Sequence, residues 1–290
     1  MGNTRADPGR LVRFANLAGR AVVVVGDRAL DVERESGGRF SSDSQAAFAD
    51  WAGFTAWAAG LSGEGEPFAA EQLGAPVPRP GQVFAIGVNY AEHAAEAGYP
   101  AEAMPVTFTK FPSCLSGPVT EVELPTDTVD WEVELVVVIG ATANRVSRDD
   151  AWGYIAGLTV GQDLSERTGQ LQGGKPQFSL AKSHRGFGPT GPWLVTPDEF
   201  ADPSNLEIGC SVSGEQMQLS RTSQLVYDVP ELIARLSGVC ELSPGDIIFT
   251  GTPAGVGNAR TPKRFLRAGD VLTSEIEGIG SLVQTFRQPA

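Results

Sequence analysis

The chain has 290 residues, 41% of them hydrophobic, and a net charge of −13 from 22 Lys and Arg against 35 Asp and Glu. This length allows one large domain or a main domain with a small one attached, and the hydrophobic content is ordinary for a soluble globular protein. The acidic balance disfavours nucleic acid and anionic membranes as partners.

The chain contains three cysteines and no CxxC pair: Cys114, Cys210 and Cys240. This pattern indicates a reducing compartment, without a disulfide scaffold or a zinc knuckle. No apolar run approaches the length of a membrane span, and the N-terminus lacks the layout of a signal peptide. We therefore expect a cytoplasmic protein.

The start of the chain predicts a small unit of its own. Residues 11–32 contain strand-like segments with turn signals and predict a β-meander, and residues 42–61 predict a helix. The aromatic residues of that helix are spaced by threes, which favours core packing: Phe48, Trp51, Phe54 and Trp57. Residues 74–82 (GAPVPRPGQ) are rich in Pro and Gly and predict a linker. The expected organisation is a small N-terminal domain at 1–73 and a main domain at 83–290.

Residues 89–98 predict a short helix or lid that ends at Gly98. His93 is one of only two histidines in the chain, and Glu96 follows it by three residues, so in a helix the two share a face. The carboxylate could orient the imidazole ring and raise its basicity, as a water-activating dyad requires. The alternative is an exposed surface pair.

Residues 130–140 (DWEVELVVVIG) form an alternating segment on which the functional interpretation is built. As a strand, the segment places its apolar side chains from Val133 onward on one face, and Glu132 and Glu134 on the other. Val136 and Val138 continue that second face, so we expect burial on both sides at the far end. Two carboxylates running into a buried end repel each other, and a hard divalent cation between them fits best. The alternative is a solvated strand end that carries acidic side chains.

Two lysines stand beside apolar residues. Lys110 shares a face with Phe108 in the strand predicted at 106–111, where it either meets a substrate carboxylate or is a plain edge-strand lysine. Lys182 lies inside the small, apolar run 178–183. A lysine in such a place needs a carboxylate, an enolate or a metal-bound anion nearby.

Asp163 follows an apolar segment, residues 152–160, where a buried strand ends. An aspartate at this point is either a metal ligand or the cap of a turn. Arg167 and Gln170 come one turn later and could reach an anionic ligand.

The last part of the chain predicts a hairpin over residues 206–219 and a short helix capped by Asp228 and ended by Gly238. The glycine-dense loop 251–257 then follows a buried strand. It lacks the ending of a phosphate loop, but its backbone N–H groups and the Thr252 hydroxyl could approach a ligand closely.

Taken together, the motifs between Phe84 and Phe286 resemble those of the fumarylacetoacetate hydrolase family. Seven occur in the family's order: Gly87–Glu96 (GVNYAEHAAE), Phe108–Lys110 (FTK), Glu132–Leu135 (EVEL), Asp163–Arg167 (DLSER), Leu180–Ser183 (LAKS), Pro244–Asp246 (PGD) and Thr250–Gly257 (TGTPAGVG). The chain departs from the family pattern at Glu166 and Thr168, where many members carry Ala and Asp, and at Phe178, where a Trp is common. These departures leave the substrate detail open.

The resemblance implies an α+β fold that is mostly β: a mixed β-roll with few helices, preceded by a small N-terminal α/β segment and assembled as a homodimer. The implied ligands of Mg²⁺, or of Mn²⁺ or Ca²⁺, are Glu132, Glu134 and Asp163. His93 and Glu96 match the water-activating dyad, and Lys182 matches the active-site lysine. The positions expected to line the substrate pocket are Phe108, Lys110, Arg167, Gln170 and Thr252.

The implied activity is metal-dependent hydrolysis of a C–C bond in 2,4-diketo acids of the acylpyruvate type. Water activated by His93 attacks the carbonyl remote from the metal, and the enolate of pyruvate leaves while the metal and Lys182 stabilise its charge. The same enolate also serves an isomerase, a tautomerase or a decarboxylase acting on related 2-oxo acids such as 2-oxo-heptenedioate and oxaloacetate. These activities remain alternatives, and a metal-holding binding protein without turnover is a third.

Overall fold

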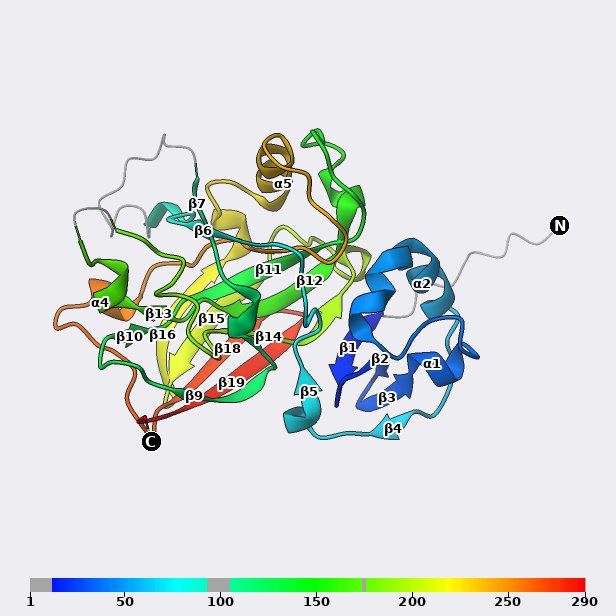
Figure 1. The fold of residues 1–290 in the computed structure, drawn as a ribbon, viewed down its shortest axis with the longest axis horizontal. Helices are drawn as coiled ribbons and strands as arrows, with labels where there is room; N and C mark the ends of the chain where they lie inside the picture. Colours follow the sequence, from blue (N-terminus) through cyan, green and yellow to red (C-terminus); the bar gives the residue numbers. More distant parts are fainter. Residues whose placement is uncertain (1–11, 93–104, 174–175, 290) are drawn as a thin grey trace.

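The computed structural model of the chain describes residues 12–92, 105–173 and 176–289. The fold is mostly β with few helices, as the sequence predicts. Its strands form a twelve-stranded mixed sheet, a five-stranded sheet that packs against it, and a two-stranded pair (Figure 1). The helices in the described part of the chain include none that could span a membrane.

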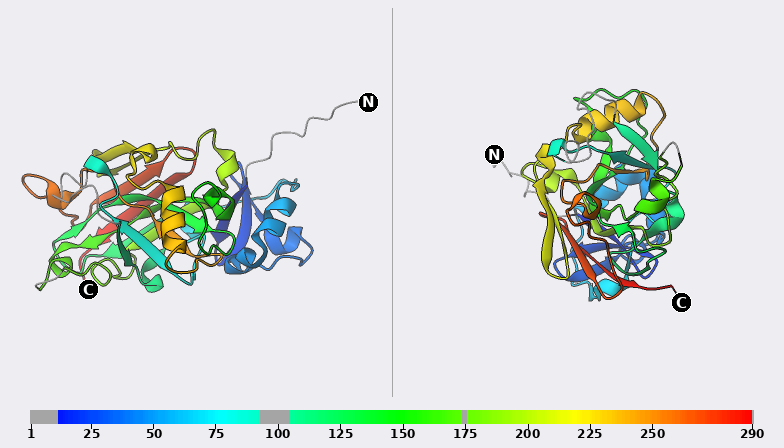
Figure 2. Two further views of the ribbon diagram at one scale, coloured as in Figure 1. Left: turned by 90° about the horizontal axis from the view of Figure 1, so that it is seen from above. Right: turned by 90° about the vertical axis from the view of Figure 1, so that its left-hand side faces the viewer.

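The predicted N-terminal meander is confirmed, and it lies at one end of an elongated molecule (Figure 2). Its antiparallel strands are β1 (Arg13–Leu17), β2 (Arg20–Val25), β3 (Arg28–Asp31) and β4 (Glu66–Pro67). A short helix, α1 (Val32–Glu35), follows β3 and is capped by Asp31, which accepts from the backbone N–H of Arg34 at 2.9 Å.

The helix predicted at residues 42–61 is divided in two. A 3₁₀ helix, η1 (Ser44–Asp50), runs into the α-helix α2 (Trp51–Ala58). The division follows from the sequence, because Asp43 caps the first turn of η1 and Asp50 caps α2 by accepting from the Gly53 N–H at 3.0 Å. Three aromatic side chains of these helices contact Phe14: Phe48, Trp51 and Phe54. Trp57 packs against Phe54, so the predicted aromatic residues share one core, which Phe40 joins from the preceding loop.

The N-terminal meander continues the main sheet. β1 pairs antiparallel with β14 (Gly188–Val195), and the indole N–H of Trp51 donates to the carbonyl of Ala156 at 3.1 Å. The proposed boundary at residues 74–82 stays a prediction, since the segments on either side share one sheet and one apolar cluster.

Strand β11 (Val133–Ile139) lies at the centre of the main sheet, and all seven of its residues are buried. It pairs antiparallel with β12 (Ile155–Gln162) and β17 (Ile247–Phe249). Leu135 faces one apolar cluster and Val136 faces the other, so the predicted burial on both sides is confirmed. Beyond β17, the sheet continues through β6 (Val83–Gly87), which is parallel to it, and β7 (Val106–Thr109).

The five-stranded sheet contains the predicted hairpin. Its order is β16 (Glu215–Arg221), β15 (Glu207–Val212), β18 (Val271–Ile276), β19 (Gly280–Arg287) and β9 (Val119–Glu123). Helix α5 (Val229–Ser237) covers the same core and is capped by Asp228, as predicted, through the Glu231 N–H at 3.0 Å.

The short elements connect these layers. The small strands are β5 (Leu73–Gly74), β8 (Leu115–Ser116), β10 (Val129–Asp130) and β13 (Ser165–Glu166). The short helices are η2 (Ala70–Gln72), η3 (Pro112–Cys114), η4 (Ala151–Tyr154), α4 (Arg167–Gln170), η5 (Pro197–Glu199), η6 (Thr222–Gln224) and η7 (Gly257–Ala259). The pair β10–β13 places Asp130 opposite Ser165. It thereby brings the residues that precede β11 next to those that precede α4.

Candidate active site

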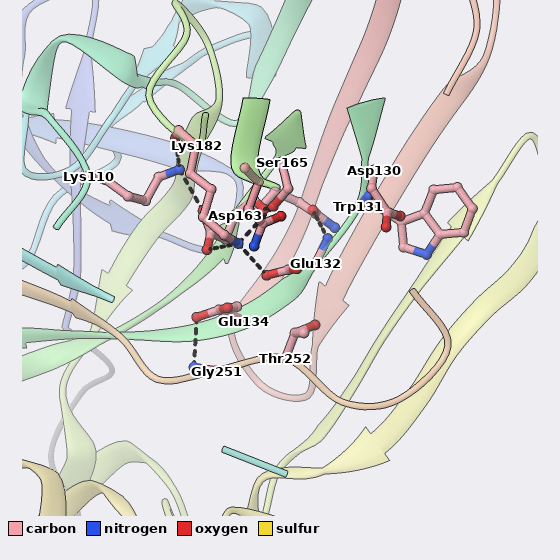
Figure 3. Close-up of polar contacts among 12 residues, drawn as sticks. Lys110, Asp130, Trp131, Glu132, Glu134, Asp163, Ser165, Lys182, Gly251 and Thr252 are labelled. Carbon is pink, nitrogen blue, oxygen red and sulfur yellow. Dashed lines mark hydrogen bonds and ion pairs between the residues drawn. The ribbon is translucent and has the colours of Figure 1, made fainter. Parts of the chain in front are cut away.

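The three carboxylates predicted from the sequence meet in one cluster (Figure 3). Glu132 immediately precedes β11, Glu134 lies within it, and Asp163 immediately follows β12. The antiparallel register opposes Glu134 to Gly161, which brings the end of β12 beside the start of β11. One oxygen from each carboxylate lies within 4.8 Å of the others, and all three side chains are buried.

The electrostatics of this cluster favour a cation. Burial, together with the neighbouring Asp163 and Glu132 charges, raises the pKa of Glu134 well above its ordinary value. The opposing influences are Lys182 and the backbone N–H of Gly251, which donates to Glu134 Oε2 at 2.7 Å. Three converging carboxylates are a hard oxygen donor set, so these residues fit Mg²⁺, Mn²⁺ or Ca²⁺.

Lys182 bridges two of the three carboxylates. Its ammonium lies 2.7 Å from both Glu132 Oε2 and Asp163 Oδ2, and 2.7 Å from the hydroxyl of Ser165. Burial alone would lower the pKa of Lys182, but the Asp163 and Glu132 charges raise it, so the side chain stays charged.

Lys110, a residue that the family resemblance places at the substrate pocket, is paired with Asp163. Its side chain is fully buried, and Nζ lies 2.6 Å from Asp163 Oδ1. It also donates to the carbonyls of Lys182 and Phe187. Lys110 therefore pairs with Asp163 inside the protein. It is not among the described residues that line the cavity beside the carboxylate cluster.

A cavity of about 350 Å³ opens beside the carboxylate cluster. Four of the five predicted pocket residues line it: Phe108, Arg167, Gln170 and Thr252. Glu132, Glu134 and Lys182 also reach its wall, so the cluster borders the cavity directly. The rest of the wall is mostly apolar and includes Ile86, Val88, Leu171, Pro176, Phe178 and Val256.

Arg167 ties the cavity wall to the cluster. Its guanidinium lies 2.7 Å from Glu132 Oε1, and its Nη1 donates to Gln170 Oε1 at 2.9 Å. It also pairs with Asp130 at 2.8 Å. Burial lowers the pKa of Arg167, but the two carboxylates more than offset this, so its pKa is raised.

Thr252 and its neighbour hold the glycine-rich loop against β11. The Thr252 hydroxyl donates to the Val133 carbonyl at 2.9 Å and accepts from Gln218 Nε2 at 2.8 Å. Gly251 has a φ of +105°, and a Cβ there would lie 2.7 Å from the Cβ of Asn89. Only glycine fits this position, and it allows the N–H to reach Glu134.

His93 and Glu96 lie outside the described residues, so the predicted dyad stays a prediction. Among the described residues that precede them, Gly87 and Val88 line the cavity. Asn89 anchors this point, since its side-chain amide donates to the carbonyls of Thr250 and Tyr227 at 2.8 and 2.9 Å.

Sequence reasoning gave no role to three polar residues of the network. The alternation places Asp130 on the same face as Glu132 and Glu134, but it does not show which groups Asp130 contacts. Ser165 and Gln218 carry no comparable signal. Gln218 comes from the distant strand β16, yet it accepts from the Val133 N–H at 3.0 Å and donates to Thr252.

Known proteins resemble this chain over most of its length. A 46% identical relative over 211 residues, 72% of this chain and 67% of its own, is a mitochondrial oxaloacetate tautomerase, FAHD2A, from Bos taurus. A 2,4-didehydro-3-deoxy-L-rhamnonate hydrolase from a Sphingomonas species is 45% identical over 221 residues, covering 75% of this chain and 76% of its own.

Solved structures share the whole fold. One described as a candidate HpcE protein from Mycobacterium smegmatis is 50% identical, with a TM-score of 0.92 over 96% of this chain and all of its own. A maleylpyruvate hydrolase from Sphingobium, in complex with manganese(II) and pyruvate, is 31% identical, with a TM-score of 0.78 over 96% of this chain and all of its own.

The family model described as the C-terminal part of fumarylacetoacetate (FAA) hydrolase matches residues 82–287. The match covers the strands that bring the three carboxylates together and the glycine-rich loop beside them. On this match and on the similarity to its relatives, the chain belongs to the fumarylacetoacetate hydrolase family.

Proposed function

We propose that this chain is a divalent-metal-dependent hydrolase that cleaves a C–C bond in 2,4-diketo acids of the acylpyruvate type. The observation that carries the proposal is the buried cluster of Glu132, Glu134 and Asp163 at the wall of a cavity, with Lys182 between two of its members. Such a cluster suits a substrate on which negative charge develops during the reaction.

Glu132, Glu134 and Asp163 would hold the cation, which we propose to be Mg²⁺ with Mn²⁺ or Ca²⁺ as substitutes. When bound, the cation would supply Lewis-acid stabilisation of the enolate charge that forms as the C–C bond breaks. The manganese and pyruvate bound to the Sphingobium maleylpyruvate hydrolase support both the ion and the 2-oxo acid.

The chain's own polar groups then bind and orient the substrate. Arg167 and Gln170 lie in the cavity wall next to Glu132, where they can donate hydrogen bonds to the substrate carboxylate. Lys182 can donate to the oxygen on which the enolate charge develops. Phe108 packs edge-on against Phe178 at 5.4 Å and supplies an apolar wall for the carbon chain.

Hydrolysis also needs activated water, which we assign to His93 assisted by Glu96. His93 takes a proton from water, and the resulting hydroxide attacks the C4 carbonyl of the 2,4-diketo acid, which is the carbonyl away from its 2-oxo acid group. The C–C bond breaks, the acyl group leaves as a carboxylic acid, and the pyruvate enolate takes up a proton to give pyruvate.

A second candidate is the keto–enol tautomerisation of oxaloacetate, favoured by the 46% identity to a relative named for it. This reaction passes through the enolate of a 2-oxo acid and moves only protons, so it does not need the hydrolytic water. Isomerisation of 2-oxo-heptenedioate and decarboxylation of oxaloacetate belong to the same group of alternatives.

One panel separates these activities. The purified chain with Mg²⁺ or Mn²⁺ is given acetylpyruvate, oxaloacetate and 2-oxo-heptenedioate, and the products are identified. Our proposal predicts pyruvate from acetylpyruvate, lost on adding EDTA and in His93→Ala. If oxaloacetate exchanges between its enol and keto forms while acetylpyruvate is not cleaved, the tautomerase replaces the proposed hydrolase. If CO₂ is released from oxaloacetate while acetylpyruvate is not cleaved, the decarboxylase replaces it.

The proposal includes a homodimer, as the family resemblance implies, and a cytoplasmic location, as the reducing-compartment pattern of the cysteines indicates. Light scattering coupled to gel filtration measures the mass of the assembly directly. A mass of twice 30.5 kDa is expected. A single-chain mass would contradict the homodimer and leave the proposed chemistry unaffected.

A further inference from the structure

Asp130 is a fully buried carboxylate that neither lines the cavity nor belongs to the carboxylate cluster among the described residues. It stands two residues before Glu132, beside Trp131 (Figure 3). A buried carboxylate is costly unless its oxygens are paired with donors, so the partners of Asp130 indicate what it does.

Four N–H groups converge on Asp130. Oδ1 accepts from the backbone N–H groups of Trp131 at 2.9 Å and Gly257 at 2.7 Å. Oδ2 accepts from Arg167 Nε at 2.8 Å and from the backbone N–H of Asn258 at 2.9 Å. One side chain therefore joins the start of β11, helix α4 and the loop at η7.

All three of these elements contribute to the cavity. Arg167 lines it from α4, Asn258 lines it from η7, and Glu132 lines it from the entrance to β11. Gly257 is required for the close approach, since a Cβ there would lie 1.8 Å from the Arg264 carbonyl oxygen and 2.8 Å from Asp130 Oδ1.

Asp130 and Glu132 both pair with the guanidinium of Arg167, so the charge of Asp130 affects the position of that guanidinium. The guanidinium lies between Asp130 and Glu132, at 2.8 and 2.7 Å. Without the Asp130 charge, Glu132 would be the nearest remaining carboxylate partner of the guanidinium, and Arg167 would shift toward it and away from its present place in the wall.

We infer that Asp130 is a positioning residue, which acts through Arg167 and through the Gly257–Asn258 backbone to hold the wall that binds the 2-oxo acid. The inference rests on the proposed function for its ligand, and it adds a residue that never touches the substrate. Asp130 thus sets the affinity for the 2-oxo acid, while Glu132, Glu134 and Asp163 set the affinity for the cation.

The test compares Asp130→Asn with a matched control, Asp246→Asn, in the full chain. Asp246 is equally buried and accepts from the backbone N–H groups of Gln82 and Ser243 at 2.8 Å, but it does not line the cavity. Calorimetry with saturating Mn²⁺ measures the Kd of pyruvate for each variant. Asp130→Asn is expected to raise this Kd about tenfold or more, the scale of a lost charged hydrogen bond, whereas Asp246→Asn leaves it near the wild-type value.

A double variant separates positioning from general destabilisation. In an Arg167→Met background, Asp130→Asn is expected to raise the Kd by a smaller factor than in the wild type, because the part of its effect that passes through Arg167 is already lost. Additive effects, or an equal rise in Asp246→Asn, would overturn the inference. If Asp130→Asn does not fold, Asp130→Glu, which keeps the charge but moves it by one methylene, is measured in the same way.

Hydrogen–deuterium exchange tests the role of Asp130 without a bound 2-oxo acid, so its result does not depend on the proposed function. The amides of Gly257 and Asn258 are expected to exchange faster in Asp130→Asn and unchanged in Asp246→Asn. If wild-type protein with Mn²⁺ binds no pyruvate, the proposed function fails, and the exchange rates still decide whether Asp130 holds the loop. Unchanged exchange at Gly257 and Asn258 in Asp130→Asn would overturn the inference.

Discussion

The ammonium of Lys110 lies 2.6 Å from Asp163 Oδ1, and neither side chain is exposed to solvent. Asp163 thus receives one lysine on each oxygen, Lys110 on Oδ1 and Lys182 on Oδ2. Only Lys182 reaches the cavity wall, so the two lysines next to this carboxylate have different surroundings.

The Lys110 pair predicts a large stability effect. Replacing Lys110 by Met leaves the Asp163 carboxylate with one buried partner fewer, and removing one member of a buried ion pair typically costs about 3–5 kcal/mol. Urea unfolding of the metal-free protein measures the loss. The matched control is Arg79→Met, which breaks a pair with Asp43 at the surface and should change the unfolding free energy little. Equal losses in the two variants would contradict the assignment.

Glu134 predicts opposite effects on metal binding and on the stability of the metal-free protein. Its raised pKa means that the charged form is disfavoured in the empty cluster, by burial and by the neighbouring carboxylates. Glu134→Gln keeps an acceptor for the Gly251 N–H but removes a cation ligand. Calorimetry should show Mn²⁺ affinity reduced by at least ~10–100-fold, whereas the Tm of the metal-free variant stays equal or rises. Full Mn²⁺ affinity in this variant would exclude Glu134 as a ligand.

Replacing Lys182 is expected to lower the catalytic rate without a loss of cation binding. Lys182→Met should lower kcat by ~10²–10³, as expected for a lost donor to developing negative charge. Mn²⁺ binding should persist, because the three carboxylates remain and a competing positive charge is gone. Steady-state kinetics and metal titration of the same preparation make the comparison. A kcat close to the wild-type value would remove Lys182 from the mechanism.

The Gly251 conformation predicts a backbone effect on the cluster. Gly251→Ala forces a residue with a Cβ into a φ of +105° and against Asn89, which typically costs about 1–3 kcal/mol. The strain should also move the N–H away from Glu134 and weaken Mn²⁺ binding. Gly153→Ala is the control, since a Cβ there meets nothing within 4 Å. Wild-type stability in Gly251→Ala would contradict the geometry of this loop.

Glu166 predicts a dependence of stability on pH. Burial by itself raises the pKa of Glu166, but hydrogen bonds from Thr128, Gly169 and other donors lower it below the ordinary 4.5. A lowered folded-state pKa contributes stability above pH 4.5, and this contribution is lost as the pH falls through the folded value. Glu166→Gln should therefore be less stable than wild type at neutral pH, with the difference shrinking in acid. Urea unfolding across this range tests the sign, and a difference that grows in acid would contradict it.

Local sequence patterns predicted much of the fold, because strand alternation and helix caps depend on residues that are close in the sequence. The alternation around Glu134 predicted β11, and Asp228 with its following proline predicted the start of α5. The pairing of β1 with β14 and of β6 with β17 could not be predicted, since these contacts join segments far apart in the sequence.

The same distinction holds for the candidate site. Glu132, Glu134 and Asp163 were predicted as a set, and the structure brings them together. The buried contact of Lys110 with Asp163 could not be predicted, because it depends on tertiary packing between segments far apart in the sequence. The role of Asp130 could not be predicted, because two of its partners, Gly257 and Asn258, lie 127 and 128 residues away.

The most direct test of the whole account is the location of Mn²⁺ in crystals, measured by anomalous scattering at the manganese edge. We predict one peak per chain, bound by one or more oxygens from each of Glu132, Glu134 and Asp163, and absent from crystals of Glu134→Gln. A peak bound elsewhere, or no peak at saturating Mn²⁺, would contradict the central claim.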